Sequence, residues 1–210
     1  MKKYLLLFFM IVSSIMASAQ STKELIDKVA DCSKYEGYDY VVVYDSTDVV
    51  MEDSGLSHVN MHKVIKMLTY RGCEQNNVVK IDYDPLSAYV EIKEVKIHRN
   101  DGTTETVTNP VLDYVAPARM IYWNASQKMV EVVHLEPGDA IEIVSYKKGY
   151  TYALLQSDDD SKYIPPMRGH YYDIIEFFGN QPIINKVYTV SVLKSKELQF
   201  EVYNGELKTA

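Results

Sequence analysis

The feature that most constrains the fold is a two-residue alternation of apolar and polar side chains. It is clearest in AIEIVSY, residues 140–146, where Ile141 and Ile143 are expected to face one way and Glu142 and Val144 the other. A two-residue period is typical of a β-strand with one buried face, because successive strand side chains point to opposite faces. In HLEPGD, which precedes this strand, Pro137 and Gly138 suit a type II turn. Asp139, which follows them, can hydrogen-bond the backbone with its side chain. Every residue of this stretch is explained as scaffold.

About ten short segments carry strand patterns, with turn signals at regular spacing between them. Long helical patterns between strands are absent, which disfavours parallel βαβ units and favours an antiparallel sandwich or barrel. The expected strands occupy residues 38–53 (a hairpin divided at Asp45-Ser46-Thr47-Asp48), 58–71, 78–84, 88–99, 103–107, 118–123, 128–135, 140–148, 150–155, 183–193 and 198–205.

The segment AYVEIKEVKIHR, residues 88–99, makes a particular prediction about faces. Asn100-Asp101-Gly102 after this segment predicts a hairpin turn into TTETV. Strict alternation along the strand would put every second side chain on the same face. The set expected on one side is Tyr89, Glu91, Lys93, Val95 and Ile97.

The N-terminus has the layout of a secretory signal peptide. Lys2 and Lys3 precede an apolar run that is too short to span a bilayer comfortably, and Ala17-Ser18-Ala19 predicts cleavage after Ala19. Residues 20–37 are then a helical lead-in, with helical spacing in 22–32, and residues 38–210 are the β-sandwich domain. Residues 165–182 are expected to be either a short helix or a loop packed by aromatic side chains.

Charge limits the partners. Removing residues 1–19 takes away two lysines and no acid, so 20 basic residues face 29 acidic ones, and the net charge is about −9. This acidic balance argues against nucleic acid and anionic membrane surfaces, which require a basic footprint. No later run approaches the ~20 apolar residues of a membrane span.

The nucleophilic triad that the chain order allows is Cys73, His98 and Asp113. A catalytic cysteine needs a stabilised thiolate. Cys73 is expected at a strand end beside Glu74, whose carboxylate would raise the thiol pKa. We therefore expect no catalytic residues and no enzymatic activity in this chain. Cys32 and Cys73 allow one disulfide after export, and free thiols are an open alternative.

No metal site or cofactor is expected either. His58 and His62 would share one face of a helix, but on a strand they lie ~13 Å apart. The acidic run Asp158-Asp159-Asp160 lacks the Gly and Glu of a dedicated calcium loop. It is expected to be a solvated loop.

Aromatic residues are numerous, with 18 Tyr, five Phe and one Trp. In the pairs Tyr122-Trp123, Tyr171-Tyr172 and Phe177-Phe178, one member can pack in a core while the other stays open to stack a sugar or dock a partner. The alternative is that Tyr is simply a good strand former.

The motif order resembles that of the domain of unknown function 3857 family, which stands N-terminal to transglutaminase-like cores in exported bacterial proteins. The resemblance rests on four stretches: HKVIKMLTYRG, VKIDYDP, EVKIHRNDGTTETV and, most specifically, HLEPGDAIEIVSY.

The resemblance implies an all-β, antiparallel, immunoglobulin-like β-sandwich with no established catalytic residues. It also implies a non-catalytic accessory role beside a downstream core with its own Cys, His and Asp, in a periplasmic, outer-surface or secreted protein. The domain would position or shield that core, or present substrate to it. The alternative is a stand-alone glycan- or peptide-binding module at the cell surface.

Overall fold

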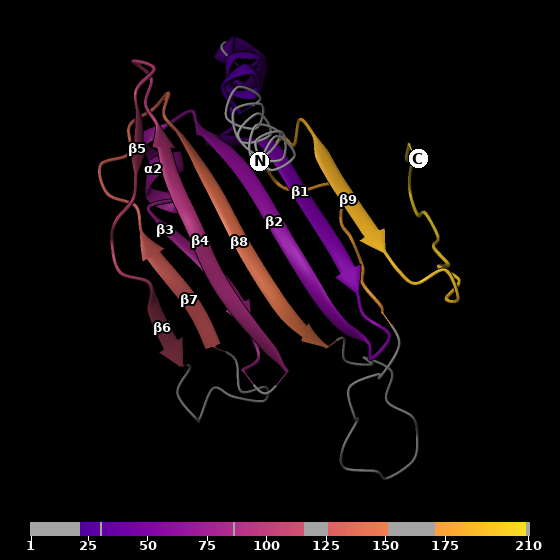
Figure 1. Cartoon of the computed structure of the whole chain (residues 1–210). Coiled ribbons are helices and arrows are strands. Elements are labelled where there is room, and N and C mark those ends of the chain that lie inside the picture. Colours follow the sequence, from indigo (N-terminus) through magenta and orange to yellow (C-terminus); the bar gives the residue numbers. More distant parts are fainter. Residues whose placement is uncertain (1–21, 30, 86, 116–125, 151–170, 209–210) are drawn as a thin grey trace, which may run out of the picture.

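The structure is a computed structural model that describes residues 22–29, 31–85, 87–115, 126–150 and 171–208. In these residues the chain forms two β-sheets, one large and one small, with short helices at one end (Figure 1). The expected all-β, sandwich-like class is confirmed.

Sheet A has six strands in the order β5-β4-β8-β2-β1-β9, and sheet B has three in the order β3-β7-β6. The elements are η1 (Cys32–Tyr35), β1 (Tyr40–Met51), β2 (Leu56–Met67), α2 (Tyr70–Gln75), β3 (Val78–Tyr83), β4 (Ala88–His98), β5 (Thr104–Thr106), β6 (Leu112–Val115), β7 (Ser126–Glu131), β8 (Ala140–Tyr150) and β9 (Lys186–Ser191).

The core lies between the two sheets. Apolar side chains of β2, β4 and β8 on the inner face of sheet A pack against β3, β7 and α2, which removes their apolar surface from water. Its buried members are Ile65, Met67, Cys73, Val79, Ile92, Val95, Ile97, Val130, Val132 and Ile141. The predicted phase of β8 is confirmed, since Ile141 belongs to this core and Glu142 faces the other way.

A second, smaller cluster lies on the outer face of sheet A. Residues 22–27 are helical, and Leu25, Ile26 and Val29 pack with valines of β1 and β2. The predicted N-terminal helix is thereby confirmed over 22–27, although residues 32–35 form a separate 3₁₀ turn.

The hairpin expected at Asp45-Ser46-Thr47-Asp48 was wrong, because β1 runs through these residues without a break. Its pairing with β2 continues from Asp45 opposite Lys63 to Asp48 opposite Asn60. β9 pairs with the same residues on the other side. A local propensity argument mistakes this polar part of a strand inside the sheet for a turn. The actual turn follows at Glu52–Gly55, where Gly55 has a φ of 86°.

The strand expected over 58–71 ends at Met67. Thr69 then caps α2, its hydroxyl accepting the Gly72 N–H at 3.1 Å. A Cβ on Gly72 would overlap the carbonyl oxygen of Asp39 and lie 2.8 Å from the carbonyl carbon, so only glycine lets the helix pack this close.

Two further differences concern β4 and the C-terminal region. A bulge between Ile92 and Glu94 moves Val95 and Ile97 to the buried face, so strict alternation through 88–98 was wrong. Strand β9 pairs with β1 in parallel, and residues 198–205 form no strand. Residues 171–182 contain no helix. The strands expected at 118–123 and 151–155 lie outside the described residues.

Candidate functional site

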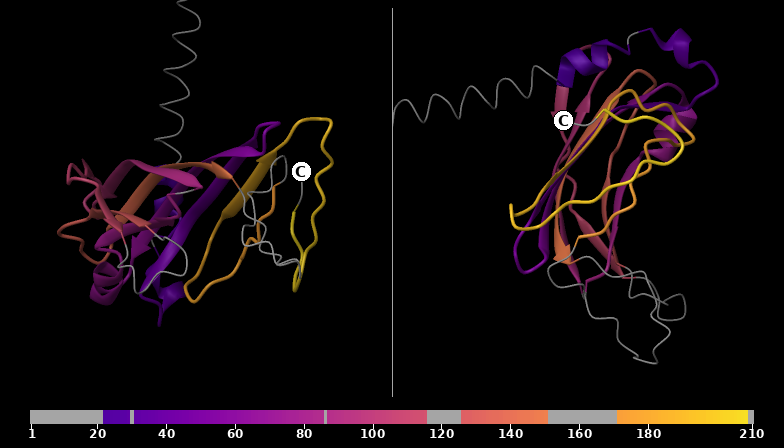
Figure 2. Two further views of the ribbon diagram at one scale, coloured as in Figure 1. Left: turned by 90° about the horizontal axis from the view of Figure 1, so that it is seen from below. Right: turned by 90° about the vertical axis from the view of Figure 1, so that its right-hand side faces the viewer.

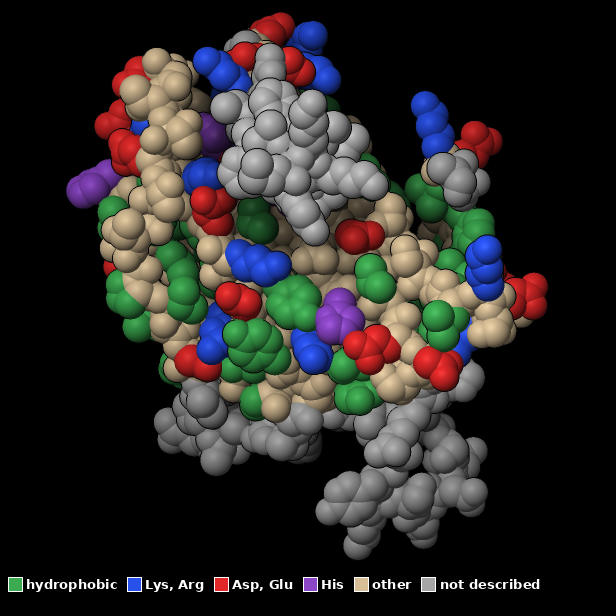
Figure 3. Space-filling view, viewed as in Figure 1, with side chains coloured by type: hydrophobic (Ala, Val, Ile, Leu, Met, Phe, Trp, Pro, Cys, Tyr) green, Lys and Arg blue, Asp and Glu red, His purple; other side chains and the backbone are tan. Residues whose placement is uncertain are grey.

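The outer face of sheet A carries two groups of polar side chains that come from different strands and contact one another. Figure 3 looks onto this face and shows acidic, basic, histidine and apolar side chains mixed over the central strands. The inner face carries the apolar core where sheet B covers it, so we sought candidate chemistry on the outer face.

Glu142, on β8 at the middle of sheet A, binds donors from three other segments. His62 Nε2 on β2 lies 2.7 Å from Glu142 Oε1, and His98 Nε2 on β4 lies 2.8 Å from Oε2. Thr22, in the N-terminal helix, donates its hydroxyl to Oε1 at 3.1 Å. We call Glu142, His62, His98 and Thr22 the Glu142 cluster.

Burial and hydrogen bonding act on the Glu142 carboxyl in opposite directions. Only 12% of its side chain is exposed, and burial alone would raise its pKa. The hydrogen bonds from His62, His98 and Thr22, with the charge of His62, outweigh burial and hold the pKa far below the ordinary value. Glu142 is therefore an ionised carboxylate at neutral pH.

The surroundings of the two histidines fix their rings. His62 lies edge-on to the Tyr44 ring at 5.3 Å between centroids, and His98 Nδ1 lies 3.2 Å from Thr104 Oγ1. Both Nε2 atoms face the carboxylate. This geometry suits a cross-strand tie better than a nucleophile–base pair, in which the base needs a reacting hydroxyl or thiol within reach.

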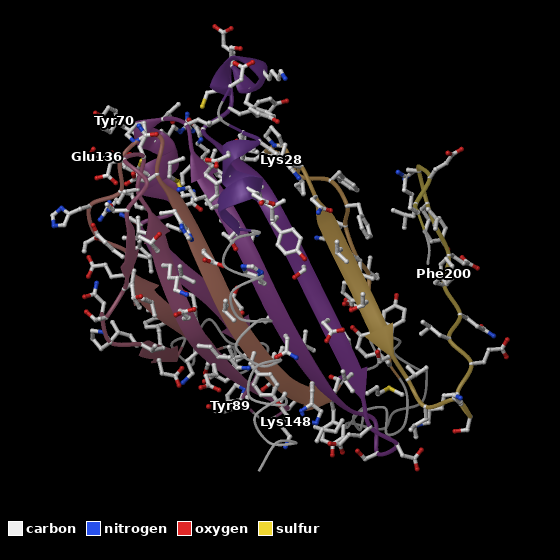
Figure 4. All side chains as sticks on the ribbon, turned by 45° about the horizontal axis from the view of Figure 1, so that its top comes forward. Lys28, Tyr70, Tyr89, Glu136, Lys148 and Phe200 are labelled. Carbon is white, nitrogen blue, oxygen red and sulfur yellow. The ribbon has the colours of Figure 1, made fainter. Side chains whose placement is uncertain are left out.

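A second polar group lies toward the other end of the same face. His58 Nδ1 lies 2.6 Å from Tyr146 Oη, its Nε2 lies 2.8 Å from Glu52, and the Lys93 ammonium lies 4.8 Å from the centre of the Tyr146 ring. Tyr89 is nearby, opposite Lys148 across β4 and β8, and is 56% exposed (Figure 4). We call this set the Tyr146 group.

The residues of the possible triad lie in separate environments. Cys73 is buried in the core, where burial and then the Asp139 carboxylate raise the pKa of its thiol. His98 belongs to the Glu142 cluster, and Asp113 on β6 binds Tyr83 and Lys128. None of the hydrogen bonds or ion pairs among the described residues joins two of the three.

The histidines four apart, His58 and His62, do share a face of β2, as their strand spacing predicts. His58 belongs to the Tyr146 group and His62 to the Glu142 cluster. No group of three metal-ligating side chains in the described residues could hold a metal ion. The acidic run at 158–160 lies outside them. Both thiols in the described residues are free, with Cys32 exposed and Cys73 buried.

The aromatic pairs behave differently from one another. Tyr171 is half-buried and hydrogen-bonds the Tyr188 hydroxyl, while Tyr172 is exposed, but neither belongs to a core cluster. Phe177 and Phe178 are both exposed, although the Lys186 ammonium lies 5.9 Å from the Phe177 ring centre. Tyr122 and Trp123 lie outside the described residues.

The Pro-Gly-Asp turn before β8 is scaffold, as the sequence indicates. Gly138 has a φ of 99°, and Asp139 N–H donates to the Glu136 carbonyl at 3.0 Å. The Asp139 carboxylate accepts the backbone N–H groups of Asn100 and Glu136 and the guanidinium of Arg99 at 2.8 Å. The turn thus locks the β4–β5 hairpin to the start of β8.

Sequence reasoning missed the Glu142 cluster and the Tyr146 group. The only available signal was a glutamate on the outward phase of β8, with histidines at outward positions of other strands. Their meeting depends on registers such as Val64 opposite Glu142, which link residues far apart in the chain.

No helix within the described part of the chain is long and apolar enough to cross a bilayer.

Among solved structures, the chain is similar to a putative protease from Parabacteroides distasonis ATCC 8503, with 16% identity and a TM-score of 0.47 over 53% of this chain and 23% of that one. It is also similar to the CBM3a-L domain of the scaffoldin cipA of the Clostridium thermocellum cellulosome, with 10% identity and a TM-score of 0.32 over 53% and 68%. A third similar structure is an M1 zinc metallopeptidase mutant from Deinococcus radiodurans. Its sequence identity is 10% and its TM-score is 0.29, over 58% of this chain and 23% of that one. The chain therefore spans about a quarter of the length of the putative protease.

No curated protein matches the chain. A family model described as "Domain of Unknown Function with solved-structure structure (DUF3857)" matches residues 53–210, which is more than half of the sequence. On this match, the chain belongs to the DUF3857 family.

Proposed function

We propose that this chain is a non-catalytic accessory β-sandwich domain of an exported transglutaminase-like protein. It positions or shields a catalytic core, or presents substrate to it, by docking through residues 171–208. The proposal places the chemistry in the core and recognition in this domain.

The observation that carries the proposal is the concentration of exposed apolar side chains in this C-terminal region. Of the 21 large apolar residues exposed in the described chain, 12 lie between residues 172 and 207. A concentration of exposed apolar side chains is a mark of an interaction site. The 12 are Tyr172, Ile174, Phe177, Phe178, Ile184, Val187, Leu193, Leu198, Phe200, Val202, Tyr203 and Leu207.

The polar clusters support a non-catalytic role. Both carboxylate oxygens of Glu142 are occupied by donors, and Cys73 is buried with a raised thiol pKa. A thiol enzyme needs the opposite, an accessible cysteine with a lowered pKa.

Cross-linking of the native protein tests the proposal. The polypeptide is recovered from the exported fraction with an antibody to residues 22–150, after lysine-directed cross-linking, and its cross-links are mapped by mass spectrometry. Cross-links from Lys194 or Lys196 to a transglutaminase-like core are expected. Lys80 and Lys128, on sheet B, are the internal comparison. A polypeptide without such a core, or one whose core cross-links only to sheet B, would contradict the proposal.

Matched variants sharpen the test. Phe200→Asp puts a charge at a position that is 66% exposed in the proposed docking region, and Tyr89→Asp does the same at a 56% exposed position on the Tyr146 group. Only Phe200→Asp is expected to reduce the cross-links to the core.

A second candidate function is a stand-alone glycan- or peptide-binding module at the cell surface. The Tyr146 group favours it, because the exposed ring of Tyr89 can stack on a ligand and the lysine and histidine nearby can hydrogen-bond it. Glycan-array and peptide binding by residues 20–210 that is lost in Tyr89→Ala, with no core in the native polypeptide, would support this alternative over the first.

A further inference from the structure

We propose that residues 197–203 close onto the outer edge of β9 as an additional antiparallel strand of sheet A. The closure has one register, in which Thr189 lies opposite Phe200. It is a property of the chain alone and does not depend on the docking proposed above.

Strand β9 is the last strand of sheet A, so one of its edges is not paired by another described strand. Asp45 N–H donates to the Asn185 carbonyl at 2.9 Å, and Asp45 pairs with Lys186 in parallel. In a parallel ladder, alternate residues direct both backbone groups to the same neighbour. The odd residues of β9 therefore bond β1, and Lys186, Tyr188 and Val190 direct N–H and C=O to the outer edge.

Residues 197–203 carry the side-chain alternation that a strand requires. The Tyr203 hydroxyl donates to the Glu201 carboxylate, which puts these two side chains on one side of the segment. Leu198, Phe200 and Val202 alternate with them, as a two-residue period requires. No backbone hydrogen bond joins residues 197–208 to another described residue.

The direction and the connection of this segment are also right for pairing. Figures 1 and 2 show it running back along β9 in the opposite direction. Between the two, Lys196 N–H donates to the Leu193 carbonyl at 2.9 Å, and the Lys196 ammonium lies 3.0 Å from the Asp53 carbonyl oxygen. The turn is thereby anchored to the β1–β2 hairpin. In the closed form, residues 193–196 are the four-residue loop of a hairpin, built around this turn.

This loop fixes the register. With Val192 opposite Glu197, the pairs at the outer edge are Val190 with Gln199, Tyr188 with Glu201 and Lys186 with Tyr203. These are the β9 residues whose backbone groups point outward. The register that the loop length sets therefore agrees with the register that the hydrogen-bonding pattern requires. The remaining pairs, on the outer face of the sheet, are Ser191 with Leu198, Thr189 with Phe200 and Val187 with Val202.

Closure arranges four of the exposed apolar residues in one strip. Val187, Leu198, Phe200 and Val202 come to lie side by side on the outer face, where cross-strand apolar pairs stabilise a sheet. The edge of β9, which would otherwise invite pairing with other chains, is covered.

Disulfide trapping tests the closure. In a Cys32→Ser background, the pair Thr189→Cys with Phe200→Cys is compared with Thr189→Cys with Gln199→Cys. In the closed strand, the thiol introduced at position 200 faces the thiol introduced at position 189 across a non-hydrogen-bonded pair, within the Cβ separation of about 4 Å that a disulfide needs. A thiol introduced at position 199 faces the opposite side of the strand. In an open segment, thiols at positions 199 and 200 are equally free to reach position 189.

We expect the 189/200 pair to form an intrachain disulfide at least about tenfold faster than the 189/199 pair, as seen by mass spectrometry and non-reducing electrophoresis. Similar rates for the two pairs, or no disulfide in either, would overturn the closure. Disulfide-linked dimers as the main product would overturn it in favour of exchange with a second copy. Amide exchange of Tyr188 and Val190 in the unmodified chain gives an independent readout. Both amides are expected to be protected, and fast exchange at both would also overturn the closure.

Discussion

His62 and His98 approach Glu142 from opposite sides, one from β2 and the other from β4, and each faces a different oxygen of the same carboxylate. Because β8 lies between β2 and β4, this single side chain ties three adjacent strands together on the outer face. Thr22 extends the tie to the N-terminal helix.

Removal of the Glu142 carboxylate should destabilise the fold. Glu142→Ala removes the buried carboxylate that His62, His98 and Thr22 share, and it is expected to lower the free energy of unfolding by about 3 kcal/mol. Glu142→Gln keeps one acceptor and should cost about 1–2 kcal/mol. Urea unfolding measures both. Glu94→Gln, in an exposed pair with Lys96, is the control and should change stability by less than about 1 kcal/mol.

The same carboxylate predicts a pH dependence. The folded-state pKa of Glu142 lies below its ordinary value of 4.5, so its contribution to stability is fully present above 4.5 and is lost as the pH falls below it. The stability difference between the natural chain and Glu142→Gln should therefore be smaller at pH 3 than at pH 5.5, measured by urea unfolding at each pH. A difference that grows on acidification would contradict the assignment.

Asp139 should be as sensitive as Glu142, because only 4% of its side chain is exposed and it accepts two backbone N–H groups and the Arg99 guanidinium. Asp139→Ala is expected to cost about 3 kcal/mol in thermal or urea unfolding. Glu105→Gln weakens the other, exposed contact of Arg99 and should cost less than about 1 kcal/mol. Equal losses of stability in the two variants would argue that the Asp139 turn does not hold the β4–β5 hairpin against β8.

The two thiols should react at very different rates. Cys32 is exposed, whereas Cys73 is buried and its thiol pKa is raised. A thiol-reactive probe at neutral pH is expected to label one thiol quickly, and Cys32→Ser should abolish this fast phase. Cys73 should react only on unfolding. Rapid labelling of Cys73, with amide or peptide hydrolysis that Cys73→Ala removes, would contradict the accessory role.

Close packing of α2 on the strand region makes Gly72→Ala costly. The added methyl group would overlap the Asp39 carbonyl group, with its carbon only 2.8 Å away, which requires backbone movement. We expect a loss of about 2 kcal/mol or more, of the order of overpacking costs. Gly205→Ala, which meets nothing within 4 Å, is the matched control and should leave the melting temperature unchanged.

The extent to which the sequence predicts this structure follows the range of the interactions. The β8 phase and the Pro-Gly-Asp turn depend on neighbouring residues, and both were predictable. The bulge at Ile92/Glu94 inserts one residue into an otherwise regular alternation, which no local pattern distinguishes from a straight strand.

The candidate site depended on longer-range information. His62 and His98 meet at Glu142 only after the registers of β2 and β4 on β8 are set, 80 and 44 residues away in the chain. The prediction of a hairpin at residues 45–48 was wrong for a related reason. Tertiary pairing on both sides of β1 holds these residues in a strand despite their turn-like composition.

The parallel pairing of β1 with β9 has a consequence for the order in which the fold assembles. Hydrogen bonding between Asp48 and Thr189 joins residues 141 positions apart, so this contact closes the longest loop of sheet A, whereas β1 and β2 meet through a short hairpin. Contacts of such long range form slowly. In a chain that emerges N-terminus first, the edge of β1 from Asp45 to Val50 therefore stays unpaired until residues 186–191 arrive. Chaperone protection should matter most during that interval, and truncation before β9 should favour aggregation.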